Sequence, residues 1–166
     1  MPDSQYPLHI VLFEPEIPPN TGNLIRLCAN TGLKLHLIEP LGFSLDAKAL
    51  RRAGLDYHES ANMSVHKDLD SCLASLGVNE HDAAARVFAV TTKGSVKYDT
   101  PNYQLGDILL FGPETRGLPE QVLEDSRVHK RIRIPMQKDS RSLNLSNAVA
   151  IITYEALRQL GHPALD

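Results

Sequence analysis

The 166-residue chain has no tryptophan, only two cysteines and no long apolar run. No stretch approaches the ~20 consecutive apolar residues that a membrane-spanning helix needs, so we expect no membrane anchor. The first apolar stretch follows no basic leader, which argues against a signal or transit peptide. Cys28 and Cys72 match no zinc-site spacing and would make a poor disulfide framework. We therefore expect a soluble, cytoplasmic protein in which both cysteines are packing residues.

Several familiar signatures of chemistry are missing as well. The seven histidines are scattered, with no H-x₃-H pair and no cysteine neighbours, so we expect no metal site. There is no G-x-S-x-G sequence, which removes the simplest serine-hydrolase interpretation. Neither the dinucleotide-binding G-x-G-x-x-G sequence nor a phosphate-binding loop ending in G-K-[ST] occurs.

What the chain does contain is a regular alternation of strand-like and helix-like segments, with 42% apolar residues overall. The strands are expected at 8–13, 33–39, 55–60, 86–92, 108–112 and 129–136. The helices are expected at 21–30, 46–53, 66–76, 119–125 and 143–160, with Asn20 capping the first. This order predicts an α/β fold in one domain, 1–166, with a mostly parallel sheet and helices on both faces.

Ligands of such sheets bind beyond the carboxyl ends of the strands, so chemistry is expected in the loops that follow them. These loops are 13–21, 91–97, 112–118 and 135–144. The first one leads into the helix 21–30, on which Leu24, Ile25 and Cys28 form an apolar face with Arg26 almost opposite. Arg26 is either an ordinary solvent-facing arginine or a fixed positive charge that holds phosphate or stabilises an alkoxide.

Two glycines, Gly112 and Gly117, bracket Pro-Glu-Thr-Arg directly after the expected strand 108–112. Glycines allow the backbone to approach a ligand closely and to turn sharply into the next helix. The segment is therefore either a well-formed turn with Glu114 and Arg116 exposed, or a binding loop.

The sequence SRSLNLSN, residues 140–147, places a run of Ser and Asn side chains before the last helix. Capping of that helix explains one or two of them, but not the whole run. One flank of this helix mixes polar and apolar side chains. Such a flank can line a binding site, form a subunit interface or face solvent on a surface helix. The members of this flank are Asn147, Ile151, Tyr154 and Arg158.

The charge is polarised along the chain. Residues 126–141 carry a net charge of +5, whereas the other residues together carry −8. A charged, solvated edge strand would explain the basic segment, and so would a surface that binds nucleic-acid phosphates. The basic residues of the segment are Arg127, Lys130, Arg131, Arg133, Lys138 and Arg141.

Together the loops resemble the three signature motifs of the SPOUT superfamily of RNA methyltransferases, in its ribose 2′-O-methylating branch. Asn20 and Arg26 fit the first motif, Glu114 the second, and Ser142 with Asn144 the third. More narrowly, EPEIPPNTGNLIRLCANTG, RRAGLDYHE, TTKG, FGPETRGLP, IRIPM and DSRSLNLSNAVA resemble the tRNA (cytidine/uridine-34-2′-O)-methyltransferases. The matching pieces run in order from residue 14 to about residue 160.

The resemblance implies a C-terminal deep trefoil knot that holds S-adenosylmethionine, with S-adenosylhomocysteine as product and no metal. The implied cofactor contacts are Val90, Gly112, Ile134, Met136, Ser142 and Leu143. It also implies a homodimer with a shared active site, and transfer of a methyl group to the wobble nucleotide in the tRNA anticodon stem-loop, with leucine tRNAs as substrates. Neither DNA nor a membrane is an expected partner.

Roles for individual residues follow from the resemblance. Arg26 would bind the target ribose or its 3′-phosphate and assist deprotonation, and Tyr154 would orient the substrate. The groups that would organise the site are Asn20, Glu114, Ser142 and Asn144. The residues that would contact tRNA phosphates are Arg51, Arg127, Lys130, Arg131, Lys138 and Arg141, with Arg52 as a further candidate.

Three alternatives stay open. The motifs specify the chemistry better than the target, so the enzyme could modify another tRNA position or ribosomal RNA. The chain could also be a non-catalytic RNA-binding module that kept the fold, although such a module has no need of Arg26, Glu114, Ser142 and Asn144 together. The third alternative is a generic nucleotide-binding α/β protein, but the glycine-rich sequence typical of that class is absent from this chain.

Overall fold

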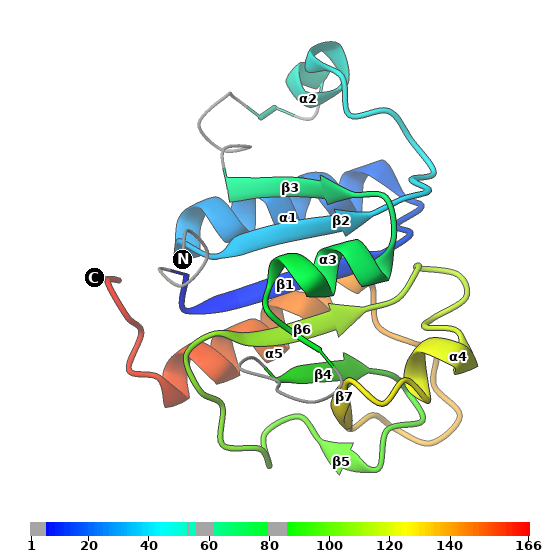
Figure 1. Ribbon diagram of the computed structural model, residues 1–166, viewed down its shortest axis with the longest axis vertical. Helices are drawn as coiled ribbons and strands as arrows, with labels where there is room; N and C mark the ends of the chain where they lie inside the picture. Colours follow the sequence, from blue (N-terminus) through cyan, green and yellow to red (C-terminus); the bar gives the residue numbers. More distant parts are fainter. Residues whose placement is uncertain (1–5, 53, 56–61, 80–85) are drawn as a thin grey trace.

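The computed structural model describes residues 6–52, 54–55, 62–79 and 86–166. The strands are β1 (Leu8–Phe13), β2 (Lys34–Ile38), β3 (Met63–His66), β4 (Val87–Val90), β5 (Val96–Lys97), β6 (Asp107–Phe111) and β7 (Val128–Arg133). The helices are α1 (Pro18–Thr31), α2 (Ala47–Arg52), α3 (Leu69–Ser75), α4 (Glu120–Leu123) and α5 (Leu145–Gln159). The strands form one sheet in the order β3-β2-β1-β6-β4-β7-β5, with every pairing parallel (Figure 1). The predicted α/β fold with a parallel sheet is confirmed.

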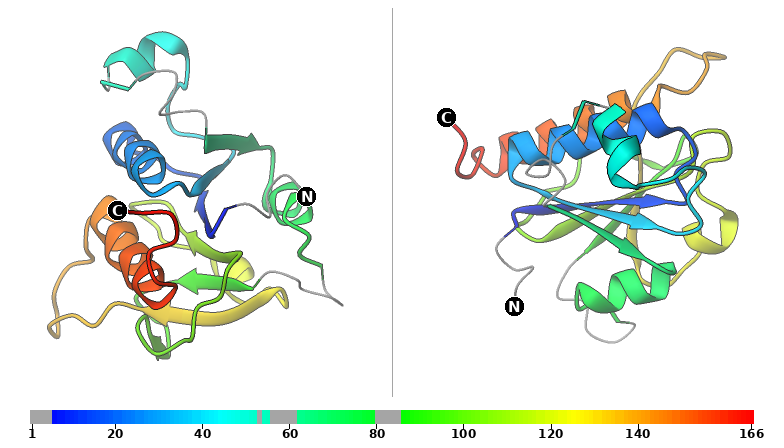
Figure 2. Two further views of the ribbon diagram at one scale, coloured as in Figure 1. Left: turned by 90° about the vertical axis from the view of Figure 1, so that its left-hand side faces the viewer. Right: turned by 90° about the horizontal axis from the view of Figure 1, so that it is seen from above.

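The two faces of the sheet are covered by different helices, as the edge-on views in Figure 2 show. Side chains alternate between the faces along each strand. Ile10 and Leu12 of β1 therefore pack in one buried cluster with residues of α1 and α5. Val11, between them, belongs to a second cluster with residues of α3 and α4. Because both faces are buried, the central strands read as nearly continuous apolar runs.

The first helix begins earlier than the sequence predicts. α1 starts at Pro18, with Ile17 in the N-cap position, so Asn20 is a buried residue of the first turn and not the cap. Proline is well tolerated in a first turn because the N–H group it lacks would have no partner there. Residues 18–20 of the PEIPPN segment therefore form the first turn of the helix, whereas residues 15–17 are irregular, as expected.

Other helix and strand boundaries also differ from the predicted ones, because side chains cap two of the helices and some strands are very short. The expected helix 66–76 begins at Leu69, because the Asp68 side chain accepts a hydrogen bond from the Ser71 amide and caps it. His66 instead ends β3, a strand that was not predicted, and β5 is only two residues long. α5 begins at Leu145, two residues later than expected, because Asn144 is its cap. The strand expected at 55–60 lies, apart from residue 55, outside the described residues.

Three histidines form a row across β1, β2 and β3. His9 Nδ1 lies 3.0 Å from His36 Nε2, and His36 Nδ1 lies 2.9 Å from His66 Nε2. Burial, with a smaller contribution from neighbouring positive charge, lowers the pKa of His36 to about 2, so its ring is neutral. These three histidines, which are scattered in the sequence, are thus direct neighbours in the structure. Their spacing in the sequence did not predict this.

The chain crosses itself closely at the carboxyl end of β7. A Cβ atom on Gly94, in the link between β4 and β5, would lie 2.7 Å from the carbonyl carbon of Ile132. The Thr91 amide also donates to the Ile132 carbonyl oxygen at 3.0 Å. β7 therefore lies in the sheet between β4 and β5, two strands that the chain joins directly through residues 91–95. Glycine at position 94 makes this crossing possible.

The described helices include none with both the length and the apolar character needed to cross a bilayer.

Candidate active site

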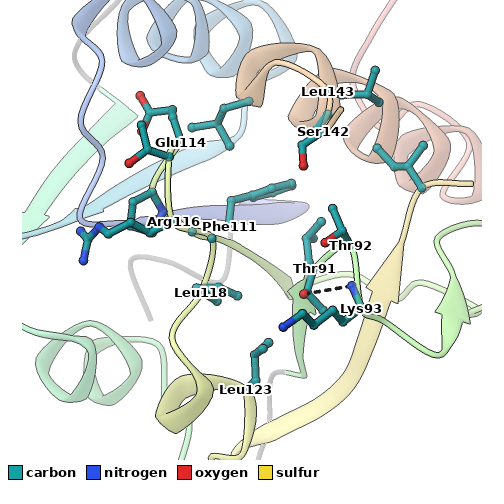
Figure 3. A pocket seen from close by; sticks show the side chains of 18 of the residues that line it. Thr91, Thr92, Lys93, Phe111, Glu114, Arg116, Leu118, Leu123, Ser142 and Leu143 are labelled. Atoms are coloured by element: carbon teal, nitrogen blue, oxygen red, sulfur yellow. Dashed lines mark hydrogen bonds between the residues drawn. The ribbon is translucent and has the colours of Figure 1, made fainter. Parts of the chain in front are cut away.

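A cavity of about 300 Å³ opens at the carboxyl edge of the sheet, where the loops after β4, β6 and β7 meet (Figure 3). All six residues expected to contact the cofactor line it: Val90, Gly112, Ile134, Met136, Ser142 and Leu143. Glu114 lines it as well. Three of the four loops in which chemistry was expected therefore contribute to one cavity.

The loop after β6 owes its shape to glycine. A Cβ atom on Gly112 would lie 2.3 Å from the amide nitrogen of Leu118, so no larger residue fits without moving the backbone. Gly117 has φ +68°, a left-handed conformation that glycine adopts readily, and its amide donates to the Pro113 carbonyl oxygen at 2.9 Å. The loop folds back on itself and lines one side of the cavity with backbone.

Several lining residues were not predicted from the sequence. Thr91, Thr92 and Lys93 follow β4 and surround the cavity together with Ser142 (Figure 3). The Lys93 amide donates to Thr91 Oγ1 at 3.2 Å, which orders the turn. The signal in the sequence was the TTKG piece itself, residues 91–94, in a loop where chemistry was expected. Apolar side chains complete the wall: Phe111, Leu118 and Leu123.

Glu114 lines the cavity but also binds the start of α1. Its carboxylate accepts hydrogen bonds from the amides of Glu16, at 2.9 Å, and Ile17, at 2.6 Å. In return, the carboxylate of Glu16 accepts from the amide and the hydroxyl of Thr115, at 3.0 and 2.7 Å. Those bonds, with Arg116 nearby, lower the pKa of Glu16. We call this pair of reciprocal contacts, made by Glu16 and Glu114, the carboxylate clamp.

Asn20 connects the clamp to the last motif. Its amide nitrogen donates to Glu114 Oε2 at 3.3 Å, and its amide oxygen lies 3.4 Å from the Ser146 hydroxyl. That hydroxyl also donates to Asn144 Oδ1 at 2.6 Å, and the same oxygen accepts from the Ser146 amide at 2.9 Å. Residues of all three predicted motifs thus meet in one hydrogen-bonded network. Ser146, which joins them, was not singled out from the sequence.

Arg26 and Tyr154 lie away from this cavity. Arg26 is exposed on α1, and its Nη2 donates to the Gly54 carbonyl oxygen at 2.6 Å. It lines a second cavity, of about 520 Å³, together with Phe43 and Arg52. Tyr154 is 46% exposed on α5. Within one chain, the structure does not bring these two expected catalytic side chains to the cavity where the expected cofactor contacts lie.

The basic residues divide into two groups. Arg127 donates to Asp125 and Asp70 at 2.7 and 2.8 Å, and its side chain is only 16% exposed. These carboxylates raise the pKa of Arg127 and hold the side chain, which leaves it less available to phosphate than the exposed basic residues. Lys130, Lys138 and Arg141 are exposed. Also exposed is Arg51 on α2, whereas Arg131 is half-buried.

The mixed flank of α5 is a continuous exposed stripe. Its four members are all exposed: Asn147, Ile151, Tyr154 and Arg158. The opposite side of the helix is buried through Val149, Ile152 and Ala156. Arg158 pairs with Glu155 at 3.0 Å on the same helix. The flank is therefore surface within one chain, and it adjoins the cavity loop through Leu143, which is 40% exposed.

The fold and the cavity define an α/β protein with a ligand site beyond the carboxyl ends of parallel strands, built on closely crossing loops. A family model described as "SpoU rRNA Methylase family" matches residues 7–154. The chain belongs to this family, and its recognition as a SPOUT methyltransferase is confirmed.

Relatives and solved structures agree with this assignment. The chain is 62% identical over 155 residues to the tRNA (cytidine(34)-2′-O)-methyltransferase of Photorhabdus asymbiotica, covering 93% of this chain and 95% of that one. A structure described as "Structural insights into the 2-OH methylation of C/U34 on tRNA" superposes with a TM-score of 0.82 at 46% identity, covering 93% and 96%. An AdoMet-bound rRNA methyltransferase from Sinorhizobium meliloti superposes with a TM-score of 0.77 at 25% identity, covering 93% of this chain and 59% of that one.

The carboxylate clamp should contribute to the stability of the folded chain. Glu114→Ala removes the acceptor for the amides of Glu16 and Ile17, so we expect the free energy of unfolding to fall by about 1–3 kcal/mol, the usual cost of leaving backbone donors unsatisfied. Urea unfolding measures the change. Glu124→Ala, which removes an exposed carboxylate at the end of α4, is the control and should change the value by less than about 0.5 kcal/mol. Equal stability of the two variants would contradict the clamp.

Proposed function

We propose that the chain transfers the methyl group of S-adenosylmethionine to the ribose 2′-oxygen of nucleotide 34, cytidine or uridine, in tRNA. The observation that carries the proposal is the convergence of all six expected cofactor residues, with Glu114, on one cavity. The named activity of a relative that is 62% identical over 93% of the chain supports the same reaction. S-adenosylhomocysteine is the second product.

The lining of the cavity suits this cofactor. Its size, about 300 Å³, is at the lower end of the range for small-molecule sites. Apolar side chains such as Phe111 and Leu118 can pack against an adenine ring, while the hydroxyls of Thr91 and Ser142 can bind ribose and amino-acid groups. Backbone of the Gly112 loop can approach the ligand closely. When bound, S-adenosylmethionine supplies an activated methyl group on a positively charged sulfur.

The residues of the chain then have to position the ribose and stabilise the negative charge that develops on its 2′-oxygen, while the 2′-proton passes to solvent. Attack by a 2′-oxygen requires alignment with the methyl group and stabilisation of developing negative charge. Arg26, always charged, binds the target ribose or its 3′-phosphate and favours loss of the 2′-proton. Asn20, Glu114, Ser142 and Asn144 keep the surrounding loops in place. Tyr154 orients the nucleotide.

A homodimer reconciles these roles with the position of Arg26 and Tyr154 outside the cavity. Of the seven large hydrophobic residues that are exposed in the described part of the chain, four lie on the β7–α5 loop and α5. They are Met136, Leu143, Ile151 and Tyr154. A second copy packed on this surface would cover them, and it would set the Arg26 of one chain beside the cavity of the other. A self-complementary pairing of this kind is the usual form of a dimer.

The C-terminal part of the chain forms a trefoil knot in this proposal. Two observations support it: β7 lies between β4 and β5, which are consecutive in the chain, and the β4–β5 link passes against the end of β7 at Gly94. In the proposed knot, the segment after β7 threads through the loop that contains this link before it reaches α5. The cavity is lined by residues from both sides of that crossing.

The direct test combines purified protein, labelled S-adenosylmethionine and total tRNA, followed by mapping of the labelled nucleotide. We expect one 2′-O-methylated residue at position 34, and identification of the labelled tRNA shows whether it is a leucine tRNA. Label at another tRNA position, or in ribosomal RNA offered alongside, would support the alternative target. RNA binding without label would support a non-catalytic module.

Arg26→Ala should lower the rate of methyl transfer by at least about 100-fold, because a preorganised charge at the developing alkoxide is lost. Binding of S-adenosylmethionine, measured by equilibrium dialysis, should be unchanged because Arg26 does not line that cavity. Lys67→Ala, which removes an exposed charge elsewhere, is the control for general electrostatic effects. Near-normal turnover of Arg26→Ala would refute the assigned role.

The affinity for tRNA should fall steeply as salt concentration rises, with a slope that reports the number of phosphate contacts. Replacing Lys130, Lys138 and Arg141 together by glutamine should reduce the slope of log K against log salt by roughly 0.7–0.9 per lost contact. Arg127→Gln is the matched control, and it should leave the slope unchanged because Asp70 and Asp125 already hold that side chain. A salt-independent affinity would show that the basic segment is not the binding surface.

A further inference from the structure

A cluster of soft ligand groups lies outside the methyl-transfer cavity. His36 of β2, His66 of β3 and Cys72 of α3 each offer one ligand atom, and the three atoms all lie within 4.8 Å of one another. His36 and Cys72 are buried, at 1% and 0% exposure, whereas His66 is half-buried. None of the three lines the cavity described above. The methyl-transfer reaction thus assigns them no role.

The donor set points to one class of ion. Two imidazoles and a thiol are the ligands that Zn²⁺ and similar divalent transition metals prefer, whereas Mg²⁺ and Ca²⁺ require oxygen ligands. Ligand atoms of a tetrahedral zinc ion lie roughly 3.3–3.7 Å apart, as its usual bond lengths dictate. The 2.9 Å between His36 Nδ1 and His66 Nε2 would therefore widen slightly, and the thiol would move inward by about 1 Å.

His9 completes the arrangement as an orienting group. His36 Nε2 lies 3.0 Å from His9 Nδ1, so it can carry the proton and donate to His9. His36 Nδ1 then has its lone pair directed toward His66 and Cys72, as a metal ligand requires. Metal-bound histidines commonly donate their other ring N–H to such a partner, which fixes the ring and its tautomer.

We propose that His36, His66 and Cys72 bind one divalent transition-metal ion of the Zn²⁺ class, with His9 as the positioning residue. The ligands come from three elements that are distant in sequence, so the ion would fasten α3 to the β2–β3 edge of the sheet. Solvent would supply the fourth ligand through the partly exposed side of His66. Binding releases the thiol proton of Cys72 to solvent, which leaves a thiolate on the metal.

The test is titration of the untagged, chelator-treated full-length protein with Co²⁺, followed by competition with Zn²⁺. We expect one ion per chain and a thiolate-to-cobalt charge-transfer band in the near ultraviolet, which excess Zn²⁺ removes. Cys72→Ser should abolish the band. Cys28→Ser is the matched control, because Cys28 is also a buried cysteine but lies on α1 and is not in the cluster, and it should keep the band. No band in the wild type, or a band that Cys72→Ser retains, would overturn the proposal.

A second measurement needs no change at the ligands. In the Cys28→Ser chain Cys72 is the sole thiol, so its alkylation rate can be followed directly. Saturating Zn²⁺ should slow the reaction at least tenfold, and an unchanged rate would count against the site. His9→Gln should keep the cobalt band but weaken metal affinity by roughly 10–100-fold, the usual effect of losing an orienting partner. An unchanged affinity would remove His9 from the proposal.

Discussion

The contact between the Glu114 carboxylate and the amides of Glu16 and Ile17, directly before α1, holds the functional end of this fold together. Backbone amides withdrawn from water need a hydrogen-bond partner, and an ionised carboxylate is a strong acceptor. Here that acceptor comes from the loop after β6, almost one hundred residues away in the chain. Because β1 and β6 are neighbouring strands, the clamp joins two loops at the same edge of the sheet. The return contact from Glu16 to Thr115 fixes their separation.

The other parts of the cavity depend on that anchor. Asn20 is positioned by the first turn of α1, and it connects Glu114 to Ser146 and Asn144 at the start of α5. The β7–α5 loop, which carries Ser142 and Leu143, is thereby fixed at its far end. On the other side, the Gly112 and Gly94 positions allow backbones to approach more closely than any side chain would permit. A cavity made of loops is thus held by hydrogen bonds near the starts of α1 and α5 and by close backbone contacts at glycine, with Arg116 pairing with Glu14 and Glu16 at 3.5 and 3.6 Å.

The sequence predicted the fold where the pattern is strong and failed where pairing or capping is local. Buried strands such as β1 and β6 are recognisable because both faces are covered, whereas β5 has two residues and no pattern to detect. Asn20 has the chemistry of a cap, but the prolines before it begin the helix one turn earlier. The cavity residues were found by resemblance to a family, and Ser146 was missed because its bonding depends on Asn20, 126 residues away. The histidine row required the parallel register of three strands, which spacing in the sequence does not reveal.

The distribution of polar and apolar groups also explains how so short a chain could act on a large substrate. The cavity uses loop residues from one chain, but Ile151 and Tyr154 lie exposed on α5 and Arg26 lies exposed on α1. These two helices pack side by side on the same face of the sheet (Figure 2). Pairing of two chains through this face would bury the apolar stripe and bring a cation to each cavity. It would also place two copies of the basic segment on one assembly. The net charge of −3 is a poor guide to partners, because it hides a segment, residues 126–141, that carries +5, and a dimer would present two copies of that segment.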